Sequence, residues 1–427
     1  MSAFKIRGLR WWVAGLLMCV TIINYLDRSC LSVAAPTLKA SLSIDEQTFS
    51  YIIIAFQITY LICHPIAGKV IDLLGLRIGF TLSITFWSLV QMASGLASGW
   101  RSFALLRGLL GVGEAGNFPG SIKAVSEWFP RKERTLATGL FNTGASVGAM
   151  VAPPLVAFII LKWSWQWAFV LTGAFGLVWA FFFYFFYRSP KEHPLLTETE
   201  FAHIRQDHTK TGEGAAKPSL KKVLKHRNFW GISVARFFSE PAWSFFVYWI
   251  PLYLSTARGM NLKQIAVFAW LPFLASDFGS LFGGALSPLF MKLRLSFLHA
   301  RKAAALTAAL IMLFAVFIGK APTPGWAVFF FCVGAFAHSA MSATLLTLPA
   351  DLFPKETVGV AYGFTGSAAL LGGMIFTFTT GYVVKHIGYA PLFPVIACLD
   401  LIGVAFLWSL VRQPISDGRL RDDCSAG

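Results

Sequence analysis

The sequence predicts an all-α integral membrane protein, with twelve transmembrane helices arranged as two pseudo-symmetric six-helix bundles. Its composition, its long apolar runs and the placement of its basic residues support this prediction. Of the 427 residues, 56% are hydrophobic and 13% are charged, whereas soluble domains carry about 25% charged residues. Because a soluble protein this apolar could not cover its surface with polar groups, we expect lipid to be the solvent for most of that surface.

Apolar runs of membrane-spanning length define the predicted helices. Crossing the hydrocarbon core takes roughly 20 residues of helix. The runs lie at 11–36, 48–73, 78–98, 102–126, 136–160, 165–187, 228–254, 264–290, 303–319, 326–349, 358–383 and 389–411. The first run continues to Asp27-Arg28 without a small-residue cleavage site. We therefore expect a retained helix there and not a signal peptide.

The basic residues give a formal net charge of +16 and lie mainly in short loops between the apolar runs. With both termini in the cytoplasm, the cytoplasmic face collects Lys5, Arg7, Arg10, Lys69, Arg77, Arg131, Lys132, Arg134, the basic residues of 188–227, Lys292, Arg294, Arg301, Lys302, Lys355, Arg412, Arg419 and Arg421. The opposite face holds Lys39, Arg101, Lys162, Arg258, Lys263, Lys320 and Lys385. This bias follows the positive-inside rule, and a missed helix would scramble it. The placement argues against nucleic-acid binding as the reason for the positive charge.

One segment, 188–227, interrupts the apolar pattern with charged residues and a Gly/Ala-rich middle at 211–216. This composition is typical of a flexible linker, which we expect to lie in the cytoplasm and partly on the membrane surface. The predicted organisation is therefore an N-terminal six-helix bundle over 1–187, the linker over 188–227, a C-terminal six-helix bundle over 228–412 and a cytoplasmic tail over 413–427.

A shift of 224 residues relates the two predicted bundles. It pairs Phe129-Pro130 with Phe353-Pro354, each after the fourth span of its bundle. It also pairs Ala137 with Ala361, Gly139 with Gly363, Ala145 with Ala369, Gly148 with Gly372 and Met150 with Met374. These matches in one register, on equivalent spans, predict a duplicated six-helix unit.

The six cysteines are scattered, and five lie within apolar runs. None has the spacing of a metal site or of a disulfide framework. No nucleophile–base pair stands out in the sequence either. We therefore expect no bound metal, no cofactor and no enzymatic activity.

Four ionisable residues of the first half fall inside predicted spans: Asp27, Arg28, Arg107 and Glu114. A charge at mid-bilayer costs at least about 2.5 kcal/mol, so each should face a cavity or a partner. Adjacent positions 27 and 28 point about 100° apart on a helix. Arg107 and Glu114 are about two turns apart on one face, so they line the same wall.

These four residue types suit a site that binds an anion and exchanges a proton. Arginine presents a fork of donors that fits a carboxylate and keeps its proton, so Arg28 and Arg107 are the candidate anion ligands. An anion competing for arginine would let a nearby carboxylate take up a proton, which couples the two binding events. Asp27 and Glu114 are the candidate proton-coupling groups. The alternative is a mutually satisfied ion network without a ligand.

Other polar and aromatic residues inside the spans are candidate cavity residues. His338 is the repeat equivalent of Glu114, as a ligand donor or titrating group, or else as a satisfied interior histidine. Arg236 can be neutralised by Glu240, four residues on, or can pair with Asp277. Asp400 is expected to be structural. The remaining candidates are Asn24 and Tyr25, one turn before the first-span charges, and Tyr60, Trp243, Asn142 and Ser146 for a sugar-sized pocket.

A loop motif, Gly68-x-x-x-Asp72-x-x-Gly75-x-Arg77, separates the second and third spans. Its glycines permit a tight turn and a close helix approach. Asp72 can pair with Arg77 or with another helix, and such a charge cluster can latch one conformation. The motif resembles the loop signature of the major facilitator superfamily, except that Leu73 replaces the usual charge after the aspartate.

Further motifs narrow the resemblance. Tyr25-Leu26-Asp27-Arg28, Arg107-Gly108-x-x-Gly111-x-x-Glu114 and Ser126-Glu127-Trp128-Phe129-Pro130-x-x-Glu133-Arg134 resemble the anion:cation symporter family. Stretches similar to bacterial hexuronate transporters lie at 8–11, 141–142, 148–155, 240–243, 249–252, 268–270 and 335–338. Together they cover nearly the whole chain up to the tail.

The resemblance implies a major facilitator fold and a proton-coupled symporter that imports hexuronates, such as glucuronate or galacturonate, by alternating access. In galactonate-type relatives the aspartate and glutamate that match Asp27 and Glu114 carry the coupling protons. The positions that match Tyr25, Arg28 and Tyr60 contact substrate. Those relatives also use a glutamine in the fifth span, where this chain has Ala145, and this departure favours the hexuronate branch.

The expected partners are a small organic anion, protons and membrane lipid, with no nucleic acid, and the protein should function as a monomer in the bacterial inner membrane. Two alternatives stay open. The cargo can be another organic anion, such as an aldonate, an aldarate or an aromatic acid. The chain can also be a transporter-like sensor that binds its ligand without moving it.

Overall fold

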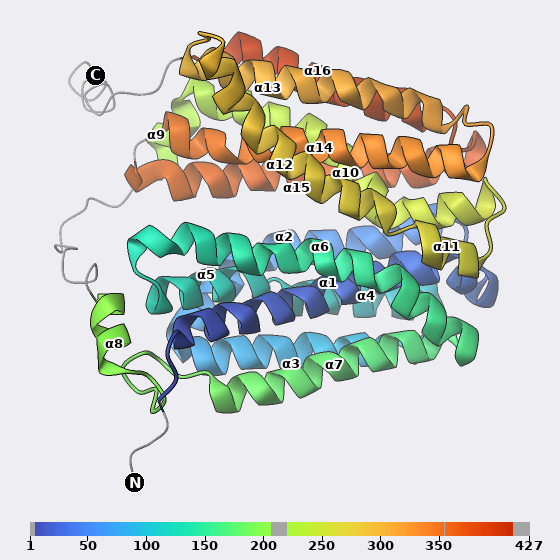
Figure 1. Ribbon diagram of the computed structural model, residues 1–427. Helices are drawn as coiled ribbons and strands as arrows, with labels where there is room; N and C mark the ends of the chain where they lie inside the picture. Colours follow the sequence, from blue (N-terminus) through green and yellow to red (C-terminus); the bar gives the residue numbers. More distant parts are fainter. Residues whose placement is uncertain (1–4, 206–219, 354, 413–427) are drawn as a thin grey trace. The chain divides into compact units, whose positions relative to one another are not determined.

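The computed structural model describes residues 5–205, 220–353 and 355–412, and the chain divides into two units. The first unit contains the described residues of Met1–Glu213 together with Asn261–Trp270, and the second contains those of Gly214–Met260 and Leu271–Gly427. The described residues are almost entirely helical, apart from one isolated β-bridge between Ile6 and Leu196 (Figure 1). The predicted fold class, an all-helical membrane protein, is confirmed.

The first unit is a bundle of long helices with two short helices, α8 and α11, beside it. Its elements are α1 (Leu9–Leu42), α2 (Glu46–Leu74), α3 (Leu76–Ser94), α4 (Trp100–Glu114), α5 (Asn117–Trp128), α6 (Arg131–Lys162), α7 (Trp165–Phe186), α8 (Glu198–Arg205) and α11 (Leu262–Phe268). Local chemistry sets several boundaries. The carboxylate of Asp45 accepts a hydrogen bond from the Thr48 N–H (2.7 Å) and caps α2, as expected of an N-cap aspartate.

The second unit has the same kind of construction. Its elements are α9 (Leu220–Lys225), α10 (Arg227–Thr256), α12 (Leu271–Lys292), α13 (Phe297–Met312), the 3₁₀ segment η2 (Leu313–Ile318), α14 (Pro324–Leu352), α15 (Lys355–His386) and α16 (Leu392–Leu410). The Lys302 ammonium donates to the Val411 carbonyl (2.7 Å) and the Trp408 carbonyl (3.2 Å). A cation at these last carbonyls stabilises the C-terminus of α16.

Ten helical stretches among the described residues are long and apolar enough to cross a membrane. The two other predicted spans coincide with helices that miss this criterion for identifiable reasons. The span at 102–126 is divided into α4 and α5 by a break at Ala115-Gly116. The span at 228–254 is the 30-residue helix α10, whose hydropathy is lowered by Arg236, Glu240 and several polar and aromatic residues.

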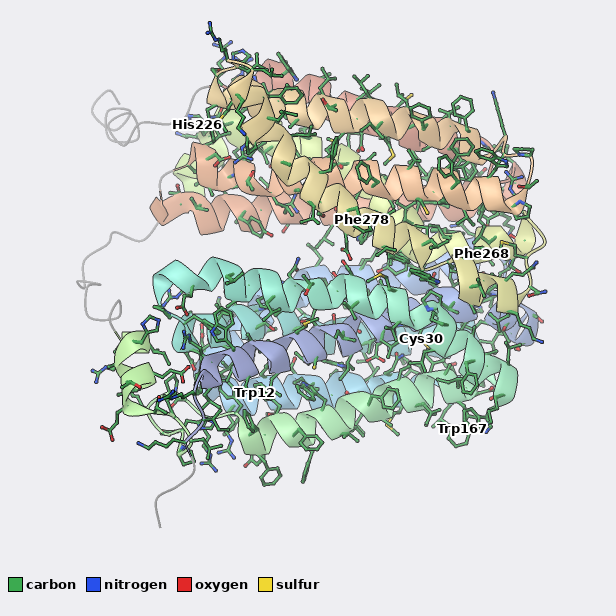
Figure 2. The ribbon with its side chains drawn as sticks, in the orientation of Figure 1. Trp12, Cys30, Trp167, His226, Phe268 and Phe278 are labelled. Carbon is green, nitrogen blue, oxygen red and sulfur yellow. The ribbon has the colours of Figure 1, made fainter. Side chains whose placement is uncertain are left out.

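The outer side chains of the first bundle suit contact with lipid. Trp12 and Trp167 lie on its outside and are 64% and 50% exposed, whereas Cys30 is fully buried within it (Figure 2). Large exposed apolar side chains occur on nearly every long helix of both units. A soluble protein would not leave this much apolar surface in water, so the distribution is that of an integral membrane protein.

Glycines on α6 and α15 show the predicted internal repeat in the packing. A Cβ added at Gly148 would stand 2.5 Å from the Ile22 carbonyl oxygen of α1, and one at Gly372 would clash with the Phe237 carbonyl oxygen of α10. The paired positions Gly139 and Gly363 both face open space. Close-approach and open positions therefore recur at the same shift of 224 residues, each within its own unit.

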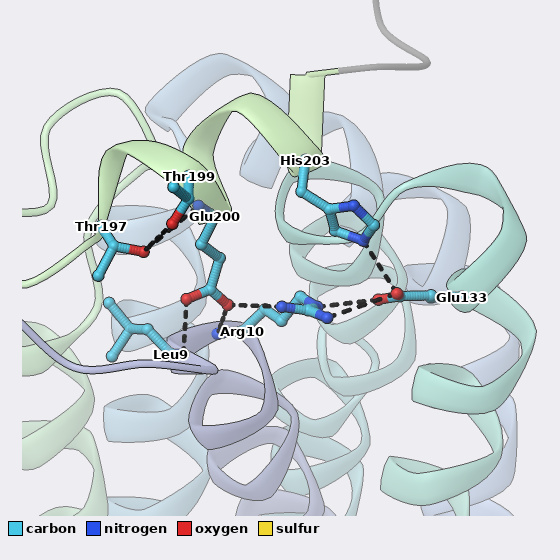
Figure 3. A network of polar contacts seen from close by, with 7 residues as sticks. All are labelled: Leu9, Arg10, Glu133, Thr197, Thr199, Glu200 and His203. Atoms are coloured by element: carbon cyan, nitrogen blue, oxygen red, sulfur yellow. Dashed lines mark hydrogen bonds and ion pairs between the residues drawn. The ribbon is translucent and has the colours of Figure 1, made fainter.

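The start of the predicted linker differs from the expected flexible segment. Residues 188–205 belong to the first unit and contact its helices: the Ile6 N–H donates to the Leu195 carbonyl (2.9 Å), and the His193 ring packs on Trp128. Buried Glu200 of α8 accepts hydrogen bonds from the N–H groups of Leu9 (3.1 Å) and Arg10 (3.2 Å) (Figure 3). Composition missed these contacts because they join residues far apart in the sequence, in the case of Glu200 and Leu9 by 191 positions. The Gly/Ala-rich middle at 211–216 lies outside the described residues.

We call Arg10, Glu133, Glu200 and His203 the α8 cap. The Arg10 guanidinium donates to Glu133 (2.8 Å) and to Glu200 (2.8 Å), and the His203 ring lies 3.0 Å from Glu133 (Figure 3). Burial raises the pKa of Glu133, but the hydrogen bonds from Arg10 and His203 outweigh it and leave that pKa below its ordinary value. The cap ties α8 to the N-termini of α1 and α6.

Candidate functional site

The two charges of α1 point in different directions. Arg28 faces α2 and Glu114 of α4, whereas Asp27 lies beside polar side chains of α3 and α7. This divergence follows from the 100° turn between neighbouring helical positions, about 3.6 residues to a turn. The two residues therefore belong to two sub-sites within the first unit.

Arg28 lies in an aromatic cage with one carboxylate. Its guanidinium carbon is 5.2 Å from the Tyr25 ring centroid, 5.1 Å from that of Phe56 and 4.5 Å from that of Tyr60. Its Nε donates to Oε2 of Glu114 at 2.5 Å, and the Glu114 side chain is fully buried. Rings stacked on a guanidinium stabilise it by cation–π attraction and keep water away. The predicted candidates Tyr25, Arg28, Tyr60 and Glu114 are thus brought together.

Asp27 occupies a second, closed sub-site. The side chains of Asp27, Asn24 and Glu114 are fully buried, and Arg107 is 2% exposed. The Arg107 guanidinium lies over the Phe103 ring of α4 and the Phe169 ring of α7, at 5.7 and 5.5 Å. Arg107 and Glu114 are the charged groups of α4 that act on Asp27. The two residues predicted to line one wall thus both act on Asp27, and Arg107 lies over the Phe103 and Phe169 rings and not over the rings of the aromatic cage.

Glycines position α4 so that its charges reach these sub-sites. A Cβ at Gly111 would clash with Thr59 of α2, and one at Gly113 would stand 2.8 Å from Trp87 of α3. The Thr59 hydroxyl also donates to the Gly108 carbonyl (2.7 Å). Small residues at these points allow the backbones to approach closely. The helix α4 therefore packs closely on α2 and α3, and its last residue, Glu114, reaches Arg28 of α1.

In the second unit, Trp243 of α10 stacks on His338 of α14, with ring centroids 5.5 Å apart and planes at 14°. Phe273 of α12 packs edge-on against the same Trp243. Next to His338, the Ser339 hydroxyl shares a 2.5 Å hydrogen bond with the Ser276 hydroxyl of α12. The two predicted ligands Trp243 and His338 thus form one platform, although no sequence pattern joined them.

The charge of Arg236 acts on Glu240, but among the described residues no direct ion pair joins the two side chains. Arg236 donates instead to the Thr365 hydroxyl of α15 (3.3 Å) and lies over the Tyr362 ring. Glu240 packs against α15 at Gly373. Asp277 is half-buried on α12. Asp400 is fully buried on α16 beside Ser239 of α10. The i, i+4 spacing permitted the Arg236–Glu240 pair, but a partner on another helix was available to Arg236.

The α6 candidates lie apart from the arginine cage. Gly144 and Gly148 form the face of α6 that packs on α1. Asn142 and Ser146 are two residues from Gly144 in either direction, which places them about 200° around the helix from that face. Asn142 is exposed and Ser146 half-buried.

The loop motif links four helices of the first unit. Gly75 has φ +77° between α2 and α3, a conformation that favours glycine, and Gly68 faces Pro119 of α5. Asp72 pairs with Lys123 of α5 (2.6 Å) and not with Arg77. Arg77 donates to the Tyr184 carbonyl of α7 (2.7 Å) and lies over its ring. The sequence left two partners open for Asp72, either Arg77 or a group on another helix. The structure shows the second, Lys123 of α5.

Sequence reasoning missed several neighbours of the site. Phe56 and His64 lie four residues before and after Tyr60 on α2, and both rings pack on the Tyr60 ring at 5.6 Å. Their i, i+4 spacing is a signal that could have found them. Gln91 and Thr172, beside Asp27, carry no such signal because they are uncharged and come from helices far apart in sequence. Within the described residues, no group of His, Cys, Asp or Glu gathers as a metal site.

Comparison with known proteins assigns the family. The model of the Major Facilitator Superfamily matches residues 17–377. The chain belongs to this superfamily. It is therefore a membrane transporter by family and not an enzyme, and a small molecule is its expected partner.

Two relatives and two solved structures locate the chain within the superfamily. It is 41% identical over 412 residues to the hexuronate transporter of Escherichia coli (strain K12), covering 96% of this chain and 95% of that protein. It is 43% identical over 324 residues to the galacturonate transporter of Dickeya chrysanthemi, covering 75% and 94%. The crystal structure of a D-xylose-proton symporter matches with a TM-score of 0.74 at 15% identity, covering 94% and 98%. A bacterial homologue of the human lysosomal transporter Spinster matches at 0.71 and 16%, covering 95% and 96%. The solved structures support the fold.

Proposed function

We propose that this protein is a proton-coupled symporter that imports hexuronates, glucuronate or galacturonate, by alternating access. The observation that carries the proposal is the Arg28–Glu114 pair inside its aromatic cage. Arginine is the residue best suited to a substrate carboxylate, and the rings of Tyr25 and Tyr60 suit the apolar face of a sugar. The names of the relatives from Escherichia coli and Dickeya chrysanthemi supply the substrate class.

The coupling follows from competition for one guanidinium. With no anion bound, Arg28 neutralises the buried carboxylate of Glu114. When a substrate carboxylate binds Arg28, the fully buried Glu114 carboxylate loses the cation to which it is hydrogen-bonded. A buried charge without a partner is strongly disfavoured, so Glu114 takes up a proton as the anion binds. Linkage requires the reverse as well: a protonated Glu114 releases Arg28 for the anion.

A second candidate function is the same mechanism with another organic anion. Relatives at 30% and 27% identity are named as probable galactarate/D-glucarate and D-galactonate transporters, and another at 30% as a probable sulfoacetate transporter. All of these named substrates are anions, which the arginine cage would accept in common. The choice of hexuronate therefore rests on the relatives with higher identity.

The remaining assignments belong to the same proposal. Protons are the coupling ion, with no other cofactor and no metal. The protein functions as a monomer in the bacterial cytoplasmic membrane with both termini in the cytoplasm, as the distribution of its basic residues supports. Substrate contacts are assigned to Tyr25, Arg28, Tyr60, Trp243 and His338. Arg107 supports the site through Asp27.

The test is Glu114→Gln in proteoliposomes. Glutamine keeps the shape of the side chain but neither charges nor exchanges a proton. We expect uptake driven by a proton gradient to be lost, while exchange of labelled for unlabelled glucuronate continues. Glu127→Gln, a carboxyl of the same unit bonded to the Tyr187 hydroxyl, serves as the control and should keep both activities. Gradient-driven uptake by Glu114→Gln at the wild-type rate would remove Glu114 from the coupling role.

A substrate panel separates the alternatives. Proton movement, followed with a pH-sensitive dye, should accompany glucuronate or galacturonate more than an aldonate, an aldarate or an aromatic acid. Preference for one of the last three would replace the hexuronate assignment. Specific binding without exchange would identify a sensor.

A further inference from the structure

On the side of α3 and α7, a pair of uncharged polar side chains lies beside Asp27. Gln91 of α3 and Thr172 of α7 are both fully buried. The Gln91 Nε2 donates to the Thr172 hydroxyl oxygen at 3.0 Å and approaches the main-chain oxygen of Asp27 at 3.5 Å.

The Asp27 carboxyl has unusual surroundings. Neither of its oxygens makes a close hydrogen bond within the described part of the chain. The Thr172 hydroxyl and the Gln91 amide are the hydrogen-bonding side chains beside it. A fully buried carboxyl without close donors is costly when ionised, so small movements of these two side chains decide how well either form is solvated.

The charged and titratable neighbours of Asp27 are few. Arg107 and Glu114 face it from α4, and the Cys30 thiol lies one turn further along α1. The helix α7 carries no charged residue, and α3 carries only Arg77 near its start. On α6 the charged residues lie only at 131–134 and at Lys162, near the two ends of the helix. On the α3 and α7 side, Gln91 and Thr172 therefore supply the polar contact.

The chemistry of the pair fits both forms of a carboxyl. An amide carries two N–H donors and a carbonyl acceptor, and a hydroxyl can donate or accept. Ionised Asp27 can receive donors from Thr172 and Gln91. Protonated Asp27 can donate its own O–H to the Gln91 carbonyl oxygen, which has no close partner among the described residues.

The walls of the pocket are rigid. A Cβ at Gly173 would stand 2.6 Å from the Ser88 carbonyl oxygen, and one at Gly176 would clash with the Ser88 hydroxyl. The two helices therefore approach closely at Ser88, one turn before Gln91 on α3, which restricts where Gln91 and Thr172 lie.

We propose that Gln91 and Thr172 are positioning residues that hold Asp27 and solvate it in both its protonated and its ionised state, and so set the pH at which it exchanges a proton. The inference rests on the proposed role of Asp27 in proton coupling. No group other than a proton is transferred: it leaves the Asp27 carboxyl as the Thr172 and Gln91 hydrogens turn to face the carboxylate.

The test is the pH profile of gradient-driven glucuronate uptake by Thr172→Val. Valine keeps the shape but removes the donor, so the ionised form of Asp27 is disfavoured and the proton is held to higher pH. We expect the alkaline limb of the profile to move up by about one pH unit, the size of one hydrogen bond to a charged group. Thr172→Ser should restore the wild-type profile, and Gln91→Met should move it in the same direction by a smaller amount.

Two controls separate the outcomes. Ser88→Ala removes a buried hydroxyl from the same α3–α7 interface. Ser88 is not among the side chains that act on the Asp27 carboxyl, so this variant should leave the profile unchanged. If Thr172→Val and Gln91→Met shift the profile no more than Ser88→Ala does, the inference is wrong. If Asp27→Asn itself retains normal gradient-driven uptake, the coupling role of Asp27 fails first, and with it this inference. The coupling role of Asp27 and the positioning role of Gln91 and Thr172 both require that Asp27→Asn loses gradient-driven uptake and retains glucuronate exchange.

Discussion

At the scale of single residues, the buried charges of the first unit are divided between two sub-sites by the geometry of one helical turn. Arg28 faces the rings of α2 together with Glu114, and Asp27 faces α3, α7 and Arg107. The sequence identified all four charges as candidates because ionisable residues inside a membrane require a partner. It could not say which arginine meets which carboxylate, since that depends on how α1 is rotated against α2 and α4.

Arg28→Lys tests whether the cage recognises a carboxylate through arginine geometry. Lysine keeps the charge but loses the planar fork and the stacking on Tyr25, Phe56 and Tyr60. We expect the Kd for glucuronate to rise roughly 10- to 100-fold, which corresponds to about 1.5–3 kcal/mol for a charge-assisted contact. Isothermal calorimetry measures this. Arg101→Lys, on the far end of α4 beside Trp100, should leave the affinity unchanged, and an unaffected Arg28→Lys would exclude Arg28 as the anion ligand.

At the scale of elements, the α8 cap shows how a segment that follows the sixth membrane helix is held on the first bundle. Glu200 accepts from the first two N–H groups of α1, which have no partner within the helix. Arg10 then joins Glu200 to Glu133 at the start of α6. Side chains of three separate elements are thereby neutralised together.

Removing the cap should lower the stability of the first bundle. Glu200→Ala leaves two N–H groups of α1 without an acceptor and removes one of the two carboxylates that the Arg10 guanidinium contacts. We expect a loss of about 1–2 kcal/mol, or roughly 2–4 °C in Tm for each kcal/mol, measured by thermal unfolding of the purified protein. Glu198→Ala removes only an exposed contact with Lys5 at 3.5 Å and should cost little. Equal Tm values for the two variants would contradict the assigned role of Glu200.

The cap should also weaken in acid. Because Arg10 and His203 hold the pKa of Glu133 below its ordinary value, the ionised form is favoured in the folded protein. The stabilisation is complete above the unfolded-state pKa, about 4.3, and is lost as the pH falls through the lower folded pKa. Tm measured across this acidic range should fall less for Glu133→Gln than for the wild type. An equal fall in both would show that Glu133 does not contribute.

At the scale of the whole molecule, the duplication places matching glycines at matching helix contacts. Gly148 packs on α1 in the first unit and Gly372 on α10 in the second, while Gly139 and Gly363 face open space. The sequence identified both pairs through the shift of 224 residues. It could not tell the close-approach pair from the open pair, because a glycine looks the same in either place.

Leucine substitutions distinguish the two kinds of position. Gly148→Leu and Gly372→Leu should each destabilise the protein by about 1–3 kcal/mol or more, because the added side chain meets a backbone carbonyl that cannot move aside. Gly139→Leu and Gly363→Leu should be neutral or slightly stabilising, since leucine favours a helix over glycine. Thermal unfolding of the four variants provides the comparison. Similar Tm values for all four would exclude the close-approach role.

The sequence by itself determined the solvent of this protein, its helices, its internal repeat and the set of buried charges, because each is a property of composition or of spacing along one helix. The contacts made by the linker, by the loop motif and by Arg236 could not be predicted from the sequence in this way. Asp72 bonds to Lys123, Arg236 to Thr365 and Glu200 to the start of α1, and each contact joins separate helices. Only the tertiary structure decided those partners, and with them the uncharged Gln91–Thr172 pair behind Asp27. The rotation of one helix against another depends on side-chain packing, which no single segment specifies.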